Sequence, residues 1–176
     1  GEAEAPISEF VLFNFPTKTY KTLTPNAFKD QTISVWGAPS LNKDRDNEFR
    51  PAVWMGDNNT FYFNRTSRDL KRIDVATFNI QTSEIKVVVE ERFNTYVEIT
   101  RPTLIDGGKE LIHWSERDGW AHLYLYDGAG KMKNQITQGP YHVESVVNVD
   151  QKNRVVYFTA NGREAGEDPY YYHLYR

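Results

Sequence analysis

The chain has 176 residues, enough for one domain or most of one. Its formal net charge is −3, and its Lys and Arg residues are scattered along the sequence; this charge distribution argues against a nucleic-acid partner. The absence of cysteine excludes a disulfide framework, a thiolate metal site and a thiol nucleophile, and no apolar run is long enough to span a membrane. A hydrophobic content of 39% with 14% aromatic residues suits many short, half-exposed strands.

Short apolar and aromatic runs, separated by turn residues, follow one another along the whole chain. No stretch longer than a turn or two has helical periodicity, so the predicted class is all-β. Residues 9–23 predict a hairpin, and the polar segment 24–49 predicts an insertion loop, within which residues 32–36 could form a strand. The strands expected after it are 51–55, 61–63, 74–79 and 84–89, then 99–105, 110–114, 122–126 and 131–137, then 145–149, 154–159 and 170–175.

One strand pattern recurs. HLYLYD at 122–127 aligns residue for residue with DVATFN at 74–79, EFVLFN at 9–14 fits the same template, and residue 173 begins another copy. The copies start at 9, 74, 122 and 173, so their spacings are 65, 48 and 51, and each complete copy leads through a turn into an outgoing strand. Periods of about 40 to 50 residues that hold four strands are typical of β-propeller blades. An ordinary meander with similar hairpins is the alternative.

Several short sequence motifs allow a more specific comparison with known families. They are IDGG at 105–108, WSERDGW at 114–120, HLYLY at 122–126, QITQG at 135–139 and RVVYF at 154–158. In order and spacing they resemble the propeller of the dipeptidyl peptidase IV family from about residue 50 to the C-terminus. The hairpin region resembles it more weakly, and the insertion hardly at all. The resemblance implies an eight-bladed propeller over an α/β-hydrolase serine peptidase that removes N-terminal dipeptides, typically after proline or alanine.

On this basis residues 1–176 are expected to form a single fragment of such a propeller, with two complete four-stranded antiparallel blades and incomplete blades at each end. Both ends of the chain look cut, and the start GEAEAPISEF lacks the pattern of a signal peptide. The expected divisions are the end of one blade at 9–23, the insertion loop at 24–49, a blade at 50–91, a blade at 97–138 and an incomplete blade at 143–176.

The catalytic residues of a serine hydrolase are not expected in this chain. No serine lies in a G-x-S-x-G turn, and Ser115 falls in a polar turn where its hydroxyl would cap backbone groups. The resemblance places the family's pair of amine-binding glutamates upstream of residue 1. Glu90 and Glu91 do not occupy that motif and are interpreted as a solvated strand end.

The resemblance also implies that residues entering a blade on the hydrolase-facing side shape the substrate cavity. Tyr96, Glu98 and Arg101 precede the first strand of a blade and are the predicted substrate-cavity residues.

Two other groups of residues are predicted to be structural. Trp114 and Trp120 are expected to pack between blades, with a carbohydrate-stacking platform as the alternative. No cofactor or metal ligand is predicted, because the four histidines share no metal-binding spacing and two of them occupy equivalent repeat positions, which suggests hydrogen bonding to a neighbouring strand. These histidines are His113, His122, His142 and His173.

Two functions remain open. The first is a non-catalytic propeller fragment of a periplasmic or secreted dipeptidyl peptidase, which gates peptide access to the hydrolase domain of the same parent chain. The second is a stand-alone propeller that binds protein or carbohydrate. Under either hypothesis the chain itself is expected to lack peptidase activity, and its open blade edges could support self-association.

Overall fold

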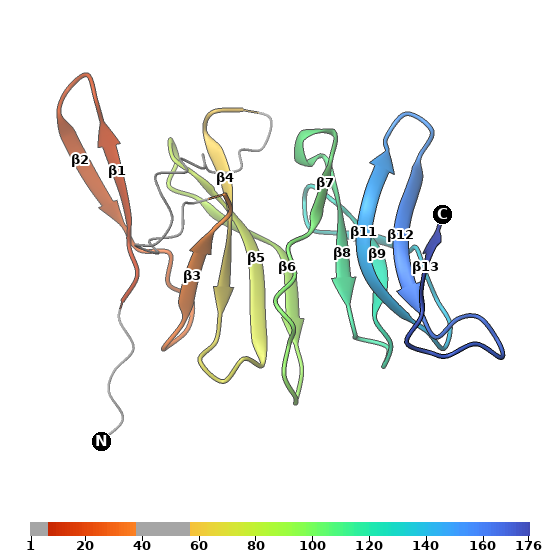
Figure 1. Ribbon diagram of the computed structural model, residues 1–176. Coiled ribbons are helices and arrows are strands. Elements are labelled where there is room, and N and C mark those ends of the chain that lie inside the picture. Colours follow the sequence, from red (N-terminus) through yellow and green to blue (C-terminus); the bar gives the residue numbers. More distant parts are fainter. Residues whose placement is uncertain (1–6, 38–56) are drawn as a thin grey trace, which may run out of the picture. The chain divides into compact units, whose positions relative to one another are not determined.

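The computed structural model describes residues 7–37 and 57–176, which fall into two compact units, Gly1–Val97 and Glu98–Arg176. Almost all of the regular structure in the described residues is β-strand, arranged in four antiparallel sheets (Figure 1). The described part contains no helix with the length and apolar character needed to cross a membrane.

The first unit is built on a four-stranded sheet with the order β3-β4-β5-β6. Its strands are β3 (Thr32–Val35), β4 (Thr60–Thr66), β5 (Arg72–Asn79) and β6 (Ile85–Arg92). Each strand pairs with its neighbour in sequence, as in a propeller blade; Phe63, for example, lies opposite Ala76.

Strand β3 lies within the segment 24–49, at the place where a strand was one of the expectations. Residues 32–35 form the edge strand of the sheet because Ile33 and Val35 alternate with polar residues, and the two apolar side chains join the buried cluster around Phe63. The strand expected at 51–55 lies outside the described residues.

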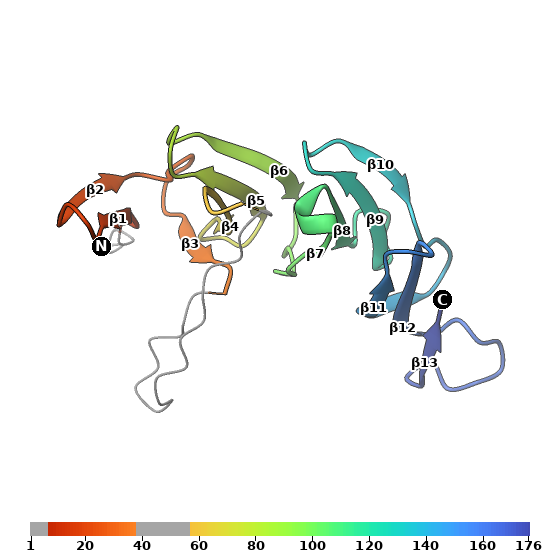
Figure 2. The ribbon, with the colours of Figure 1, turned by 90° about the horizontal axis from the view of Figure 1, so that it is seen from above.

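A two-stranded hairpin, β1 (Phe10–Asn14) and β2 (Thr19–Leu23), packs on one face of this sheet (Figure 2). Phe10 is its buried anchor. Its ring makes edge-on contacts with Phe61, Phe63 and Phe78, at centroid distances of 5.3, 5.1 and 5.2 Å. Because a lone hairpin is only marginally stable in water, this aromatic contact is expected to be the main stabilising contact between the hairpin and the sheet.

The second unit begins with a sheet of order β10-β9-β8-β7. Its elements are β7 (Thr103–Ile105), the short 3-10 turn η1 (Asp106–Gly108), β8 (Glu110–Ser115), β9 (His122–Asp127) and β10 (Met132–Gln135). The turn after β9 needs glycine: a Cβ on Gly128 would lie 2.4 Å from the carbonyl oxygen of Gly108, and Gly130 has a φ of 90°.

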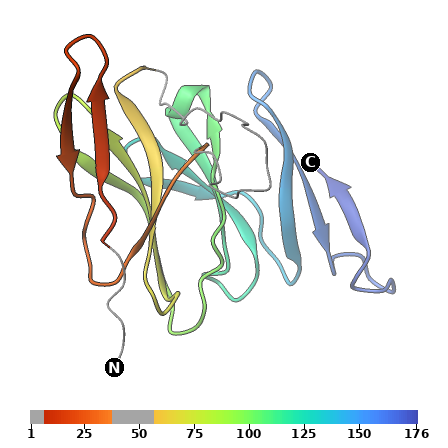
Figure 3. The ribbon, with the colours of Figure 1, turned by 60° about the vertical axis from the view of Figure 1, so that its left-hand side comes forward.

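A three-stranded sheet completes the second unit, with β11 (His142–Asp150), β12 (Val155–Asn161) and β13 (Tyr172–Tyr175) in that order (Figure 3). It packs face to face on the β7–β10 sheet. Ile112, Leu123 and Leu125 from one sheet meet Val143 and Phe158 from the other in a single buried cluster. Two blade-like sheets therefore share one hydrophobic core.

The recurring polar position at the start of the repeat has a structural role in both four-stranded sheets. Asp74 and His122 are each 0% exposed. Asp74 binds Arg65 and Arg72, whereas the two ring nitrogens of His122 lie 3.0 Å from Thr137 Oγ1 and 2.9 Å from the carbonyl oxygen of Gly139. His122 therefore forms hydrogen bonds, as predicted, but with the segment between β10 and β11 and not with a neighbouring strand.

The fourth copy differs, because His173 is partly exposed and its Nε2 lies 2.8 Å from Glu167 Oε2. Within the described ranges, no three His, Asp or Glu side chains are grouped as metal ligands.

An ion-pair cluster around Glu110 links the two sheets of the second unit. The Glu110 carboxylate receives Lys133 from β10 and Arg154 from the turn before β12, and its side chain is only 15% exposed. Hydrogen bonds from Arg154 and then Lys133 lower the pKa of Glu110 to about 2, against the opposing effect of desolvation.

Replacing Glu110 with glutamine is expected to lower the free energy of unfolding at pH 7 by about 1–2 kcal/mol. Because the folded pKa is below the unfolded value of 4.5, the ionised carboxylate stabilises the fold above about pH 4.5, and this contribution is lost as pH falls towards about 2. Urea titrations at several pH values should therefore show the difference between wild type and variant shrinking over that range. Asp106→Asn, which alters an exposed ion pair with Lys109, is the control and should have little effect on the free energy of unfolding. If the loss of stability in Glu110→Gln did not depend on pH, the lowered pKa of Glu110 would be contradicted.

Candidate functional site

A groove of about 310 Å³ lies between the two sheets of the second unit. Its walls are apolar, formed by Ile112, Leu123 and Val146, and its charged groups are Arg101 and Glu144. Hydroxyl groups complete the lining: Thr100, Thr103 and Ser145. An apolar wall with a few polar groups is the usual composition of a small-molecule or peptide-binding site.

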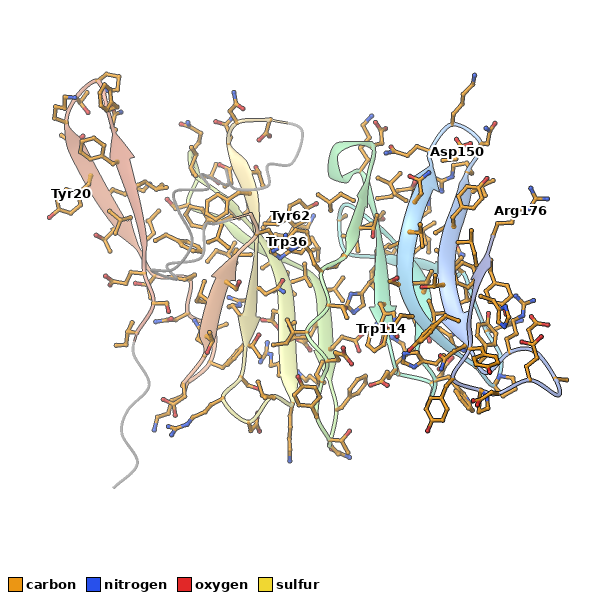
Figure 4. All side chains as sticks on the ribbon, viewed as in Figure 1. Tyr20, Trp36, Tyr62, Trp114, Asp150 and Arg176 are labelled. Carbon is orange, nitrogen blue, oxygen red and sulfur yellow. The ribbon has the colours of Figure 1, made fainter. Side chains whose placement is uncertain are left out.

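Trp114 fixes the shape of this groove. Its indole Nε1 donates to the carbonyl oxygen of Val143 at 2.6 Å, and its ring meets His142 edge-on at a centroid distance of 5.9 Å. Figure 4 labels Trp114, which lies near the end of β8. On the other side, the Thr100 hydroxyl donates to the Trp114 carbonyl oxygen at 3.4 Å. Trp114 therefore connects β8 to β11 and to the segment before β7. The prediction that it packs between blades is confirmed for these two sheets.

The polar groups from β11 at the groove have partners of their own. Glu144 lies 3.6 Å from His142 Nε2, an interaction that is an ion pair only when the histidine is protonated. The Ser145 hydroxyl lies 3.0 Å from the Thr159 hydroxyl, which cannot act as a base for it. The groove can hold a dipolar or hydrogen-bonding ligand against an apolar wall.

The three predicted substrate-cavity residues occupy different positions. Arg101 lines the groove, whereas Glu98 is exposed in the same unit and is not part of the lining. Tyr96 belongs to the first unit, where its side chain is 57% exposed. The segment before Tyr96 is fixed to the β4–β5 turn, because Phe93 N donates to Lys71 O at 3.0 Å. The substrate roles of these residues stay predictions.

The sequence did not indicate Glu144 and Ser145. They come from β11, which belongs to a different sheet from the predicted residues, and only the stacking of the two sheets brings β11 to the groove. The alternation of exposed and buried residues along β11 shows that some side chains leave the core, but it does not show what they face.

Two other residues differ from expectation. Glu91 is 4% exposed instead of solvated, because it lies opposite Ile73 on a covered face of the sheet, while Glu90 projects on the other face and pairs with Arg72 and Arg92. Trp120 is 46% exposed and is not packed between blades, since it lies in the turn beyond the end of β8.

Ser115 behaves as predicted. It is buried, and its hydroxyl accepts hydrogen bonds from Arg117 N at 3.2 Å and Arg117 Nε at 3.0 Å. This hydroxyl caps its own turn.

Residues 17–176 match the model of the family described as the dipeptidyl peptidase IV (DPP IV) N-terminal region. The chain belongs to this family. Among curated DPP IV relatives, dipeptidyl peptidase 4 of Trichophyton equinum is 23% identical over 163 residues, which cover 90% of this chain and 19% of the relative. The probable dipeptidyl peptidase 4 of Aspergillus flavus is 28% identical over 138 residues, which cover 70% of this chain and 17% of the relative.

Solved DPP IV structures share the fold. Porphyromonas gingivalis dipeptidyl peptidase 4 superposes with a TM-score of 0.69 at 19% identity, covering 90% of this chain and 21% of that one. A putative dipeptidyl aminopeptidase IV from Bacteroides ovatus gives a TM-score of 0.62 at 23% identity, covering 90% and 24%. The prediction of a partial β-propeller is confirmed. The chain spans about a fifth of the length of the first curated relatives it matches.

Proposed function

We propose that this chain is a non-catalytic part of the propeller in a dipeptidyl peptidase IV-like serine exopeptidase. In the longer protein it would help to form the wall along which an N-terminal peptide reaches a hydrolase site that releases Xaa-Pro or Xaa-Ala dipeptides. The observation that carries this proposal is the family match across residues 17–176. A periplasmic or secreted location belongs to the same proposal.

The groove of the second unit supports a binding role. Arg101 offers a guanidinium that can donate to a peptide carbonyl or carboxylate, and the wall of Ile112, Leu123 and Val146 can receive an apolar side chain. The Ser115 hydroxyl accepts from Arg117 N, and the Ser145 hydroxyl lies 3.0 Å from that of Thr159. In this proposal hydrolysis is supplied by a separate domain of the longer protein, and this chain contributes to substrate binding.

The test is the hydrolysis of Gly-Pro-p-nitroanilide and of longer peptides that begin with Gly-Pro by the protein encoded by the complete reading frame. Arg101→Ala is expected to raise KM for the longer peptides about three- to tenfold while kcat changes less than about twofold, because a charge-assisted contact that serves binding is removed. Lys152→Ala, another exposed cation of the second unit, is the control and should change neither constant.

The outcomes separate the two parts of the proposal. Absence of dipeptide release by the complete protein would overturn the proposed function. Dipeptide release with unchanged kinetics in Arg101→Ala would remove only the substrate role of Arg101. The 176-residue chain alone is expected to release no p-nitroaniline, and activity above the uncatalysed rate would show that it contains a catalytic site.

A further inference from the structure

A second cavity, of about 540 Å³, lies in the first unit and is lined mainly by charged residues. It lies at the end of the β3–β6 sheet where the β4–β5 turn, the end of β6 and the segment before β3 meet. Five cations line it against two carboxylates, Asp30 and Asp69. The cations are Lys29, Arg68, Lys71, Arg72 and Arg92.

Two carboxylates behind this cavity pair with arginines. Asp74 is contacted by Arg65 at 2.9 Å and by Arg72 at 3.0 Å, and Glu90 is contacted by Arg72 at 3.1 Å and by Arg92 at 2.9 Å. These two carboxylates are therefore engaged by Arg65, Arg72 and Arg92. The residues that line the cavity itself include five cations and two carboxylates.

The rim adds further positive charge. Asp69 is bound within its own turn: its Oδ1 accepts from the Ser67 hydroxyl at 2.6 Å and from Lys71 N at 3.2 Å. Those hydrogen bonds lower the pKa of Asp69, so it is ionised at neutral pH and partly offsets the nearby Lys71. Lys29 is exposed and forms no salt bridge with any residue in the described ranges.

Aromatic rings also line the cavity. The Arg72 guanidinium carbon lies 4.4 Å from the centroid of the Phe28 ring, and Phe93 also contributes to the lining. A cation held against an aromatic ring is less hydrated than one in open solvent, which strengthens its attraction for an anion. The whole chain carries a net charge of −3, so a local excess of positive charge is opposite in sign to the protein as a whole.

We propose that this cavity binds an oxyanion, a carboxylate or a phosphate group, through Lys29, Lys71 and the arginines at its base. Guanidinium and ammonium groups supply only donors, and carboxylate and phosphate oxygens are their matching acceptors. The site differs from the Arg101 groove and goes beyond the proposed function, which needs no anion here.

The test is a titration of the 176-residue chain with two probes at low salt. Binding is detected from changes in the backbone amide chemical shifts by NMR. The probes are inorganic phosphate and the capped dipeptide acetyl-Glu-Glu-amide, with acetyl-Gln-Gln-amide as the uncharged reference. Lys29→Gln/Lys71→Gln is the test variant, and Lys131→Gln/Lys152→Gln, two exposed lysines of the second unit, is the charge-matched control. Circular dichroism checks that each variant keeps its strand content.

At least one anion is expected to cause saturable changes in the amide chemical shifts of Ser67, Lys71 and Phe93. The affinity obtained from these changes should fall about fivefold or more in the test variant and stay the same in the control. Raising the salt concentration should weaken the binding. Saturation by phosphate alone would assign a phosphate site, and saturation by acetyl-Glu-Glu-amide alone would assign a carboxylate site. The proposal is overturned if neither anion saturates these shifts, or if the control variant loses as much affinity as the test variant.

Discussion

Replacing Asp74 with alanine is expected to lower the free energy of unfolding of the first unit by about 3–5 kcal/mol. The Asp74 side chain is fully buried and accepts hydrogen bonds from Arg65 Nε at 3.1 Å and from Arg72 Nε at 3.0 Å. Its removal leaves the buried guanidinium of Arg65, whose side chain is 5% exposed, without its carboxylate. Urea unfolding followed by circular dichroism measures the loss.

Glu90→Gln is the matched control for Asp74→Ala. Glu90 binds the same Arg72 from a carboxylate that is 43% exposed, so its replacement should cost less than about 1 kcal/mol. If the Asp74 and Glu90 variants were equally stable, burial would not be the property that makes the Asp74 pair important.

Replacing Phe10 with alanine is expected to detach the β1–β2 hairpin from its sheet, with a loss of about 3–5 kcal/mol. Phe10 contacts three other phenylalanine rings, and the rest of the hairpin has few buried side chains to replace this contact. Hydrogen exchange should show the hairpin amides losing protection while those of β4 and β5 keep most of theirs.

Phe13→Ala is the control for Phe10→Ala. It removes an aromatic ring from the same strand, but that ring is 58% exposed and lies on the opposite face of the hairpin. Its hairpin amides should keep their protection. Equal loss of protection in both variants would show that the contact of Phe10 with the three rings does not hold the hairpin in place.

The strand pattern could be predicted from the sequence because its signals are local. The repeat at residues 74–79 and 122–127 marks β5 and β9 within two residues, and the DGAG turn after β9 marks the hairpin that follows. Alternating side chains and turn residues act within a few positions, so they survive in a single sequence.

Contacts between segments that are distant in the chain are not predicted by these local signals. Strand β3 pairs with β4 across a separation of about thirty residues, for example Ile33 with Arg65, and the sequence between them offered a nearer candidate at 51–55. Glu91 is buried although a charged residue at a strand end is usually solvated, and nothing local in the sequence shows that its face of the sheet is covered.

The candidate site was predictable only in part, for the same reason. Arg101 precedes a strand at a position that the family resemblance singles out, and the structure places it in a groove. Its partners in that groove come from β11. The basic cavity of the first unit likewise gathers Lys29, Lys71 and Arg92 from three separate segments, which no local motif connects.

Cross-strand Hα–Hα nuclear Overhauser effects in the second unit test the central claim, that strands pair within successive blades and that the blades stack by their faces. Cross-peaks are predicted along β8–β9 and β11–β12, which pair as Ile112 with Leu125 and Val146 with Phe158. None is predicted between β10 and β11, which follow each other in sequence but belong to different sheets. A continuous ladder of cross-peaks joining β10 to β11 would contradict the account.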